Sequence, residues 1–358
     1  MTTYAYTSLT TNYIPKARVL AQTFKRHNPT SKFIVFMAEA IPPHLQELEP
    51  CFDEIIHISE LGIERLQPWI FSHSVVEICT AIKGHALSSL LARPDCEQVF
   101  YIDPDIAVFD SFDDLVAQFA RGSVLLTPHQ LAPDTTPRAI EDNELCYLMH
   151  GVYNLGFLAV HNDRDGRRFA DWWRERLTAY CYAEYGSGLF TDQKWIDLAP
   201  ALFPFIHIVR DPGYNVATWN LSTRKVIGGF EAGFEVQETA PEEVAAEGQR
   251  YPLRFYHFSG FDSGAQLNML RRYGLEMPAT FLLREWYIAE CARNGQESFG
   301  GVPWEYGVYQ NGETITLEQR RLYRQRDDLQ SRFSDPFRTQ DNSESYYHWY
   351  FSYGVLGG

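Results

Sequence analysis

Two carboxylates separated by a single proline are the residues of this chain best suited to chemistry. Asp103 and Asp105 follow an apolar run in the stretch EQVFYIDPDIAVFDSFDDL, residues 97–115. Like charges this close repel each other unless a cation neutralises them. Carboxylate oxygens bind Mg²⁺ or Mn²⁺, which keep part of their coordination shell for phosphate and water. The pair therefore predicts a divalent-metal site, and the alternative is a strand that ends in a solvated Asp-Pro-Asp turn.

A histidine much later in the chain offers a third ligand for the same cation. The segment YHFSGF, residues 256–261, places His257 at the end of a β segment and close to Ser259 and Gly260. Neutral imidazole is a metal ligand, and small residues beside it let backbone amides approach a phosphate. We therefore expect His257 to bind the metal and Ser259 and Gly260 to contact phosphate. A purely structural histidine is the alternative.

The elements that must position these residues alternate between apolar strands and helices. We expect strands over residues 3–9, 32–39, 54–61 and 98–103, with helices within 12–29 and 75–93. This alternation is typical of a doubly wound, mostly parallel α/β sheet that is covered on both faces. Ligands of such sheets bind beyond the carboxyl ends of the strands, which is where Asp103 and Asp105 fall.

The rest of the chain continues in the same way and then changes character. Strands are predicted at 123–128, within 149–162 and within 205–226, a helix at 165–185, and β segments that lead to His257. After residue 265 we expect a charged helix over 315–333 and an irregular aromatic tail over 334–354. This pattern favours one domain over residues 1–264 with an extension over 265–358.

Composition limits the partners and the compartment. The 358 residues carry a formal net charge of −15, which argues against nucleic acid and against a polybasic membrane patch. None of the six cysteines has the spacing of a zinc site, and free thiols fit a reducing cytosol. The sequence shows neither a signal peptide nor a transmembrane segment, so we expect a cytoplasmic protein.

Several motifs, taken in order, resemble a known family. They are TSLTTNYIPKARVLAQTFKRHNP (7–29), VVEICTAIKGHAL (75–87), VFYIDPDIAVF (99–109), YNLGFLAV (153–160), TDQKWID (191–197) and YHFSG (256–260). Together they are similar to the metal-dependent glycosyltransferases of GT-A fold, family 8, the group of glycogenin and the lipopolysaccharide galactosyltransferases. Each motif is weak alone, and the combination covers roughly residues 1–262.

The resemblance implies a GT-A fold, a Mn²⁺ or Mg²⁺ cofactor and a nucleotide-sugar donor, for which a UDP-sugar is the first candidate. The sugar would pass to a glycan, glycolipid or protein acceptor with retention of configuration, as in the family, or with inversion, in which case Asp192 would be the general base. Residues 1–264 would form the catalytic domain, and residues 265–358 would serve the acceptor side or an oligomer contact. An enzyme of this kind could also contact a membrane surface peripherally.

The resemblance also assigns residues. Asp103 and Asp105 match the family's metal and donor aspartates, and His257 matches its late metal-binding histidine. The nucleoside would lie against Thr7 and Ser8 at the end of the first strand, with Tyr13 nearby. The helix residue Lys83 would contact the phosphate or the sugar of the donor. The sugar and the reaction centre would be lined by Asn154, Asp192 and Gln193.

One departure from the family lies next to the histidine. The family continues from H-F-x-G toward K-P-W, whose lysine contacts the diphosphate, but here the chain reads FDSGAQLNML, residues 261–270. The backbone of Ser259 and Gly260, Arg271 or a tail residue would have to replace that lysine.

Two other functions fit part of the pattern. Aspartate-nucleophile phosphatases also carry D-x-D after a strand, but they usually open the fold with it and need Thr or Val where this chain has Ala107. A non-catalytic carbohydrate-binding protein with a transferase fold is the other alternative.

Overall fold

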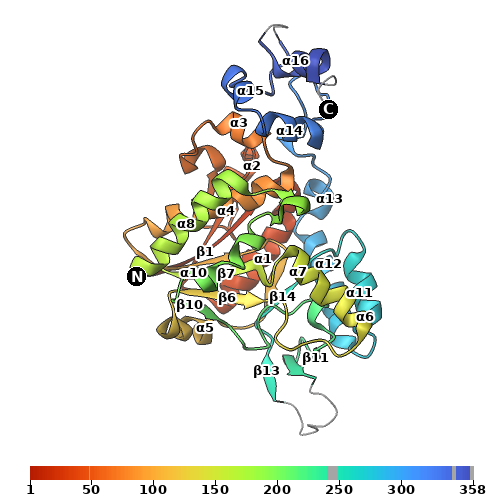
Figure 1. The fold of residues 1–358 in the computed structure, drawn as a ribbon. Helices are drawn as coiled ribbons and strands as arrows, with labels where there is room; N and C mark the ends of the chain where they lie inside the picture. Colours follow the sequence, from red (N-terminus) through yellow and green to blue (C-terminus); the bar gives the residue numbers. More distant parts are fainter. Residues whose placement is uncertain (48, 240–248, 341–343, 355–358) are drawn as a thin grey trace.

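A mixed sheet forms the centre of this computed structural model, which describes residues 1–47, 49–239, 249–340 and 344–354 (Figure 1). Across the described residues the sheet has seven strands in the order β10-β6-β7-β4-β1-β2-β3. Neighbours pair parallel except at β7, which runs antiparallel to β4 and β6. The strands are β1 (Thr2–Leu9), β2 (Lys32–Met37), β3 (Glu54–His57), β4 (Cys96–Ile102), β6 (Val124–Pro128), β7 (Tyr153–His161) and β10 (Ile206–Ile208). The expected mostly parallel α/β sheet is confirmed.

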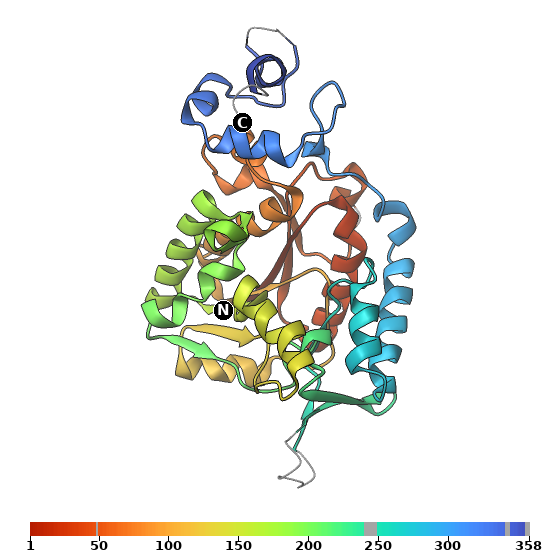
Figure 2. The same ribbon diagram turned by 45° about the vertical axis from the view of Figure 1, so that its right-hand side comes forward.

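Helices cover both faces of this sheet (Figure 2). Helices α4 (Val75–Leu91) and α8 (Arg164–Tyr180) pack on one face, and α1 (Ile14–His27) packs on the other. Because side chains alternate along a strand, Tyr6 of β1 faces α4 while Ala5 and Leu9 face α1. Helix α4 begins with a capping box, in which the Ser74 and Glu77 side chains bond each other's backbone N–H groups.

Small sheets and short helices surround the central layer. Strand β5 (Ile106–Val108) pairs with β14 (Phe255–His257), β8 (Ala183–Glu184) pairs with β9 (Leu189–Phe190), and β11 (Arg224–Gly229), β12 (Gly233–Glu238) and β13 (Arg250–Pro252) form a three-stranded sheet. The short helices are α2 (Pro43–Glu47), α3 (Leu66–Phe71), α5 (Asp113–Ala117), α6 (Pro137–Ala139), α7 (Leu145–His150), α9 (Gln193–Ile196) and α10 (Ala199–Leu202).

The C-terminal part is helical and lies against two sides of the sheet layer. Helices α11 (Ala265–Tyr273) and α12 (Pro278–Arg293) share a core with β11 and β12, and α12 also packs against α1. Helices α13 (Gln296–Phe299), α14 (Leu317–Arg324), α15 (Asp327–Arg332) and α16 (Tyr346–Tyr353) follow, and α14 to α16 form the end drawn in blue beside α3 (Figure 1). Within the described ranges, no helix has both the length and the hydropathy needed to cross a bilayer.

Two expectations for this part were wrong. The single charged helix over 315–333 is two helices, because Arg326 adopts an extended conformation between them. The tail expected to be irregular contains α16, which Ser345 caps and which buries Tyr346 and Tyr350 one turn apart. Residues 341–343 of that tail lie outside the described residues.

Candidate active site

The acidic pair lies where the inner strand β4 ends. The Asp103 N–H donates to the Gly156 carbonyl of β7 at 2.7 Å, and the Ile106 N–H donates to the Asp103 carbonyl at 3.1 Å. The second bond closes a four-residue turn with Pro104 at its second position, where the fixed φ of proline suits the turn. The proline therefore stabilises the backbone turn that places Asp103 and Asp105 next to each other.

Sheet register brings His257 to this turn. Strand β14 pairs antiparallel with β5, so His257 lies opposite Ile106, directly after Asp105. The His257 Nε2 atom is 2.9 Å from Asp105 Oδ1 and 3.9 Å from Asp103 Oδ2. One ligand atom from each of these three residues lies within 4.8 Å of the others. Two carboxylate oxygens and one imidazole nitrogen at this spacing fit a divalent cation that accepts oxygen and nitrogen.

Charge and burial act together on this group. Burial would lower the pKa of His257, but the Asp105 carboxylate outweighs it and raises the pKa. Burial likewise opposes ionisation of Asp105, and the imidazole prevails and lowers that pKa. The protein charges alone thus favour an imidazolium–carboxylate pair, and a cation would compete with the proton on His257.

Gly156 provides the space that His257 occupies. A Cβ atom at this position would lie 2.5 Å from His257 Cε1 and 2.8 Å from Asn154 Oδ1. Any side chain here would push the imidazole away from the acidic pair. The glycine of the YNLGFLAV motif is therefore part of the ligand site, although it contributes no polar side-chain atom.

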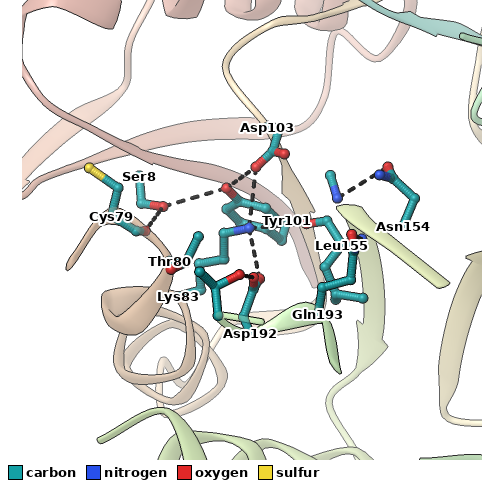
Figure 3. Close-up of polar contacts among 12 residues, drawn as sticks. Ser8, Cys79, Thr80, Lys83, Tyr101, Asp103, Asn154, Leu155, Asp192 and Gln193 are labelled. Atoms are coloured by element: carbon teal, nitrogen blue, oxygen red, sulfur yellow. Dashed lines mark hydrogen bonds and ion pairs between the residues drawn. The ribbon is translucent and has the colours of Figure 1, made fainter. Parts of the chain in front are cut away.

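A buried lysine lies between two aspartates (Figure 3), beside the candidate metal-ligand group formed by Asp103, Asp105 and His257. The Lys83 ammonium is 2.8 Å from Asp192 Oδ2 and 3.3 Å from Asp103 Oδ1, and it donates to the Leu155 carbonyl at 3.1 Å. The Tyr101 hydroxyl donates to the same Asp103 oxygen. Burial would lower the pKa of Lys83, but Asp103 and Asp192 raise it, so the amine stays charged in the interior.

Asp192 precedes α9 but does not cap it. Its side chain makes no cap hydrogen bond; Oδ1 accepts from the Thr191 hydroxyl at 3.1 Å, and Oδ2 faces Lys83. Burial raises the pKa of Asp192, and Lys83 opposes that rise. The Asp192 carboxylate is therefore directed at Lys83 and Thr191 and not at the backbone of α9.

Asn154 and Gln193 hold neighbouring parts of the site. The Asn154 Oδ1 atom accepts from the Gly156 N–H at 3.2 Å. The Gln193 side chain accepts from the Leu155 N–H and donates to the His150 carbonyl, both at 3.1 Å. Both amides are thus fixed by backbone groups, and both line the same cavity as Lys83.

All these side chains line one open cavity of about 680 Å³, a volume that accommodates a small-molecule ligand. Most of the predicted site residues lie on its wall: Ser8, Tyr13, Lys83, Asp103, Asp105, Asn154, Asp192, Gln193, His257 and Ser259. Thr7 does not, because it points to the opposite face of β1 from Ser8. Gly260 also lies off the wall, and its φ of 69° places it in a turn.

Sequence reasoning missed several residues of the site. Tyr101, His129 and Tyr147 line the cavity. Lys16 does not line the cavity, but it is almost fully buried, pairs with Asp262 at 2.8 Å and lies 3.5 Å from the centre of the ring of Tyr13, which does. The alternation of β4 would have found Tyr101, which precedes Asp103 by two residues and faces the same side. Nothing in the local pattern marks His129 or Lys16.

Comparison with known proteins finds similar sequences and structures but does not assign the chain to a family. No family model matches the chain. Two uncharacterized proteins of Bacillus subtilis (strain 168) are similar in sequence. YfnF is 27% identical over 237 residues, which is 64% of this chain and 71% of YfnF. YfnD is 27% identical over 209 residues, which is 57% of this chain and 60% of YfnD.

Two solved structures are also similar. One is the galactosyltransferase LgtC in complex with donor and acceptor sugar analogs, with a TM-score of 0.44 and 15% identity over 86% of this chain and 99% of LgtC. The other is mouse xyloside xylosyltransferase 1, with a TM-score of 0.39 and 11% identity over 72% of this chain and 96% of that chain. Similarity at this level does not transfer an activity, so function has to be argued from the residues of this chain.

Proposed function

We propose that this chain is a metal-dependent glycosyltransferase. It would move a sugar from a nucleotide-diphosphate sugar to a hydroxyl group of a glycan, glycolipid or protein. A UDP-sugar is the first donor to test. One observation carries the proposal: a two-carboxylate, one-imidazole ligand group and a buried lysine share one wall of a single cavity. A sugar diphosphate presents the matching chemistry, since its charge needs cations while its sugar needs fixed polar groups.

Asp103, Asp105 and His257 would hold the cation. The imidazole in the group favours Mn²⁺ over Mg²⁺, which prefers oxygen ligands. A bound cation of this type would supply positive charge to offset the charge on a leaving diphosphate. Ser259 would contact the phosphate, and Ser8 near the end of β1 and Tyr13 in the turn that follows would contact the nucleoside.

We propose that the transfer retains configuration; the inverting alternative would use Asp192 as a general base. In the retaining course the bond from the anomeric carbon to the diphosphate breaks, the acceptor oxygen bonds the same face, and its proton passes to the released diphosphate oxygen. The sugar carries positive charge at the transition state. Asp192, already in contact with Lys83 and the Thr191 hydroxyl, would stabilise that charge rather than take a proton. Gln193 and Asn154 would position the sugar.

The C-terminal extension would shape the acceptor side. The Tyr273 hydroxyl of α11 donates to Asp142, a cavity residue, at 2.8 Å. At the other side of the cavity, Arg324 of α14 pairs with Glu77 at the start of α4, next to the cavity residues Val75 and Val76. We propose that residues 265–358 hold these two walls in place around the acceptor.

A thermal-shift screen of nucleotide sugars with and without Mn²⁺ tests the function. A ligand that binds the folded state raises the melting temperature, so the pattern of shifts names the donor. Hydrolysis or transfer of that donor should follow, and should be lost in Asp105→Ala. Asp110→Asn is the matched control, because Asp110 comes from the same acidic stretch but pairs with Arg254 and does not line the cavity.

The outcomes separate the alternatives. A melting temperature that no nucleotide sugar shifts, in a folded and Mn²⁺-binding protein, would reject the transferase. Donor binding without turnover would indicate the carbohydrate-binding alternative. A phosphorylated Asp103 trapped during turnover of a phosphate ester would establish the phosphatase.

A further inference from the structure

A row of buried polar side chains runs from the metal-ligand group into the protein. His257, Asn154 and His129 are exposed to only 5%, 6% and 7%. The His257 Nδ1 atom is 3.3 Å from Asn154 Oδ1, and Asn154 Nδ2 is 3.3 Å from His129 Nε2. The row ends at the Val152 carbonyl, 3.1 Å from His129 Nδ1. Among the described residues, the hydrogen bonds that join His129 to His257 run through Asn154, and the Trp219 ring packs against both imidazoles.

Backbone groups fix the direction of every bond in this row. The Gly156 N–H can only donate, and it points at Asn154 Oδ1 at 3.2 Å, so the oxygen of Asn154 faces His257. At the other end the Val152 carbonyl can only accept, so His129 carries its proton on Nδ1. His129 Nε2 then has a lone pair and accepts from the Asn154 amide.

We propose that His129 is a positioning residue that, through Asn154, keeps the Nε2 lone pair of His257 directed at Asp103 and Asp105. With Asn154 Oδ1 as acceptor, His257 donates from Nδ1 and leaves Nε2 free as a metal ligand. Hydrogen bonds from the second nitrogen commonly fix ligating histidines in this way. The inference rests on the metal site of the proposed function and not on the transfer chemistry.

The opposite arrangement shows what His129 prevents. If the Asn154 amide turned over, its NH₂ group would face the Gly156 N–H, and two donors would meet without an acceptor. His257 would then have to accept at Nδ1 and carry its proton on Nε2. That proton would point at the carboxylates and occupy the position of the cation.

The surroundings of His129 hold its ring in place. The ring stacks on Tyr147 with centroids 4.8 Å apart and planes 15° apart, and it meets the edge of Trp219 at 5.5 Å. The Asn220 side chain donates to the His129 carbonyl at 3.0 Å. Burial lowers the pKa of His129 to about 4, so the ring is neutral near pH 7 and can act as an acceptor. A neutral, fixed acceptor is what the row requires.

Two measurements without any nucleotide sugar test this inference. Long-range ¹H–¹⁵N NMR of the wild-type protein should show His129 protonated on Nδ1 only. Mn²⁺ binding, followed by EPR of the free ion, should weaken roughly 10- to 100-fold in His129→Phe, the loss typical when a group behind a metal ligand is removed. His129→Gln supplies a new acceptor and should recover part of the affinity.

His207→Phe is the matched control, because it is the same exchange at a histidine that bonds the Gln118 side chain and does not line the cavity. It should bind Mn²⁺ as the wild type does. A His129 proton on Nε2, or a folded His129→Phe with wild-type Mn²⁺ affinity, would overturn the inference. Because neither readout needs a sugar donor, failure of the transferase proposal leaves this test intact.

Discussion

Two acid–base clusters along helix α4 differ in their charge balance. The closed cluster lies at the first turn of the helix and joins the C-terminal extension, with residues Glu77, Glu184, Arg321 and Arg324. The open cluster lies further along α4 and lines the cavity, with residues Lys83, Asp103, Asp105, Asp192 and His257. The first sets two carboxylates against two guanidinium groups, while the second sets three carboxylates against one ammonium and one imidazole.

The difference separates stability from function. In the closed cluster Arg324 stacks over the Tyr182 ring at 3.9 Å, and its partners Glu77 and Glu184 offset its charge. Such a pair costs little while intact and much once broken. The open cluster keeps an excess of negative charge beside a cavity. Repulsion among its carboxylates is unfavourable without a cation, and a bound cation would offset it. Removing an acid should therefore have opposite consequences in the two clusters.

The largest effect is expected from Asp103→Asn in the open cluster. The amide keeps an acceptor for Tyr101 but weakens the candidate cation site, so kcat/KM for the proposed sugar transfer should fall by about 10³-fold, the loss typical for one preorganised electrostatic group. The free energy of unfolding should change by less than about 1.5 kcal/mol, the net value of one hydrogen bond. Steady-state kinetics and urea unfolding measure the two quantities. A variant that unfolds easily would place Asp103 with the structural residues instead.

Glu77→Gln in the closed cluster should do the reverse. It leaves Arg324 with one fewer anionic partner in the interior, and breaking a buried pair costs about 3 kcal/mol of unfolding free energy. Activity per folded molecule should stay near the wild-type value. Urea unfolding of this variant is compared with Glu175→Gln on the exposed side of α8, which should match the wild type. Equal stability of both variants would contradict the assignment.

The pH dependence of His73, which lies beside Glu77 and Arg324 of the closed cluster, gives a smaller effect. Burial lowers the pKa of His73 to about 4, and the groups that face it are Trp69, Glu77, Tyr182, Arg320 and Arg324. The unfolded chain binds a proton at this residue below its usual pKa near 6.5, while the folded chain does not. Stability therefore falls as pH drops through this window, by about 2 kcal/mol from this residue between pH 6.5 and 5.

His73→Phe isolates that contribution. The substitution keeps a ring between Trp69 and Tyr182 and removes the titrating group. Its unfolding free energy, measured in urea at pH 6.5 and pH 5, should change less than that of the wild type by about the same 2 kcal/mol. An equal change in unfolding free energy between the two pH values for both proteins would assign the acid sensitivity to other groups.

The parts predicted from sequence are those in which chemistry follows local structure. Asp103 and Asp105 end an apolar strand, and the turn through Pro104 needs only neighbouring residues. The order of motifs along the chain was enough to connect His257 and Lys83 with this turn. Tertiary pairs were beyond reach, such as the contact of Lys83 with Asp192, because no spacing in the sequence encodes it.

Two misplacements show the physical limit. Thr7 and Ser8 are adjacent on a strand covered on both faces, so the apolar pattern does not tell which side chain borders the cavity. The structure puts Ser8 there and buries Thr7 on the side of α1. Helix α16 was missed because its aromatic run has no polar face, and it forms by burying Tyr346 and Tyr350 against the rest of the extension.

The smallest effect distinguishes burial from charge count within the closed cluster. Arg321 Nε lies 3.9 Å from Glu184 with its side chain 49% exposed, whereas the Arg324 side chain is 6% exposed. Solvent screens the first pair, so Arg321→Gln should cost no more than about 0.5 kcal/mol in urea unfolding. Arg324→Gln should cost about 3 kcal/mol, because it strands buried carboxylates. Equal losses of unfolding free energy in the two variants would mean that net charge alone, and not burial, holds the extension to α4. The excess negative charge of the open cluster would then have to lower the stability of the fold as well.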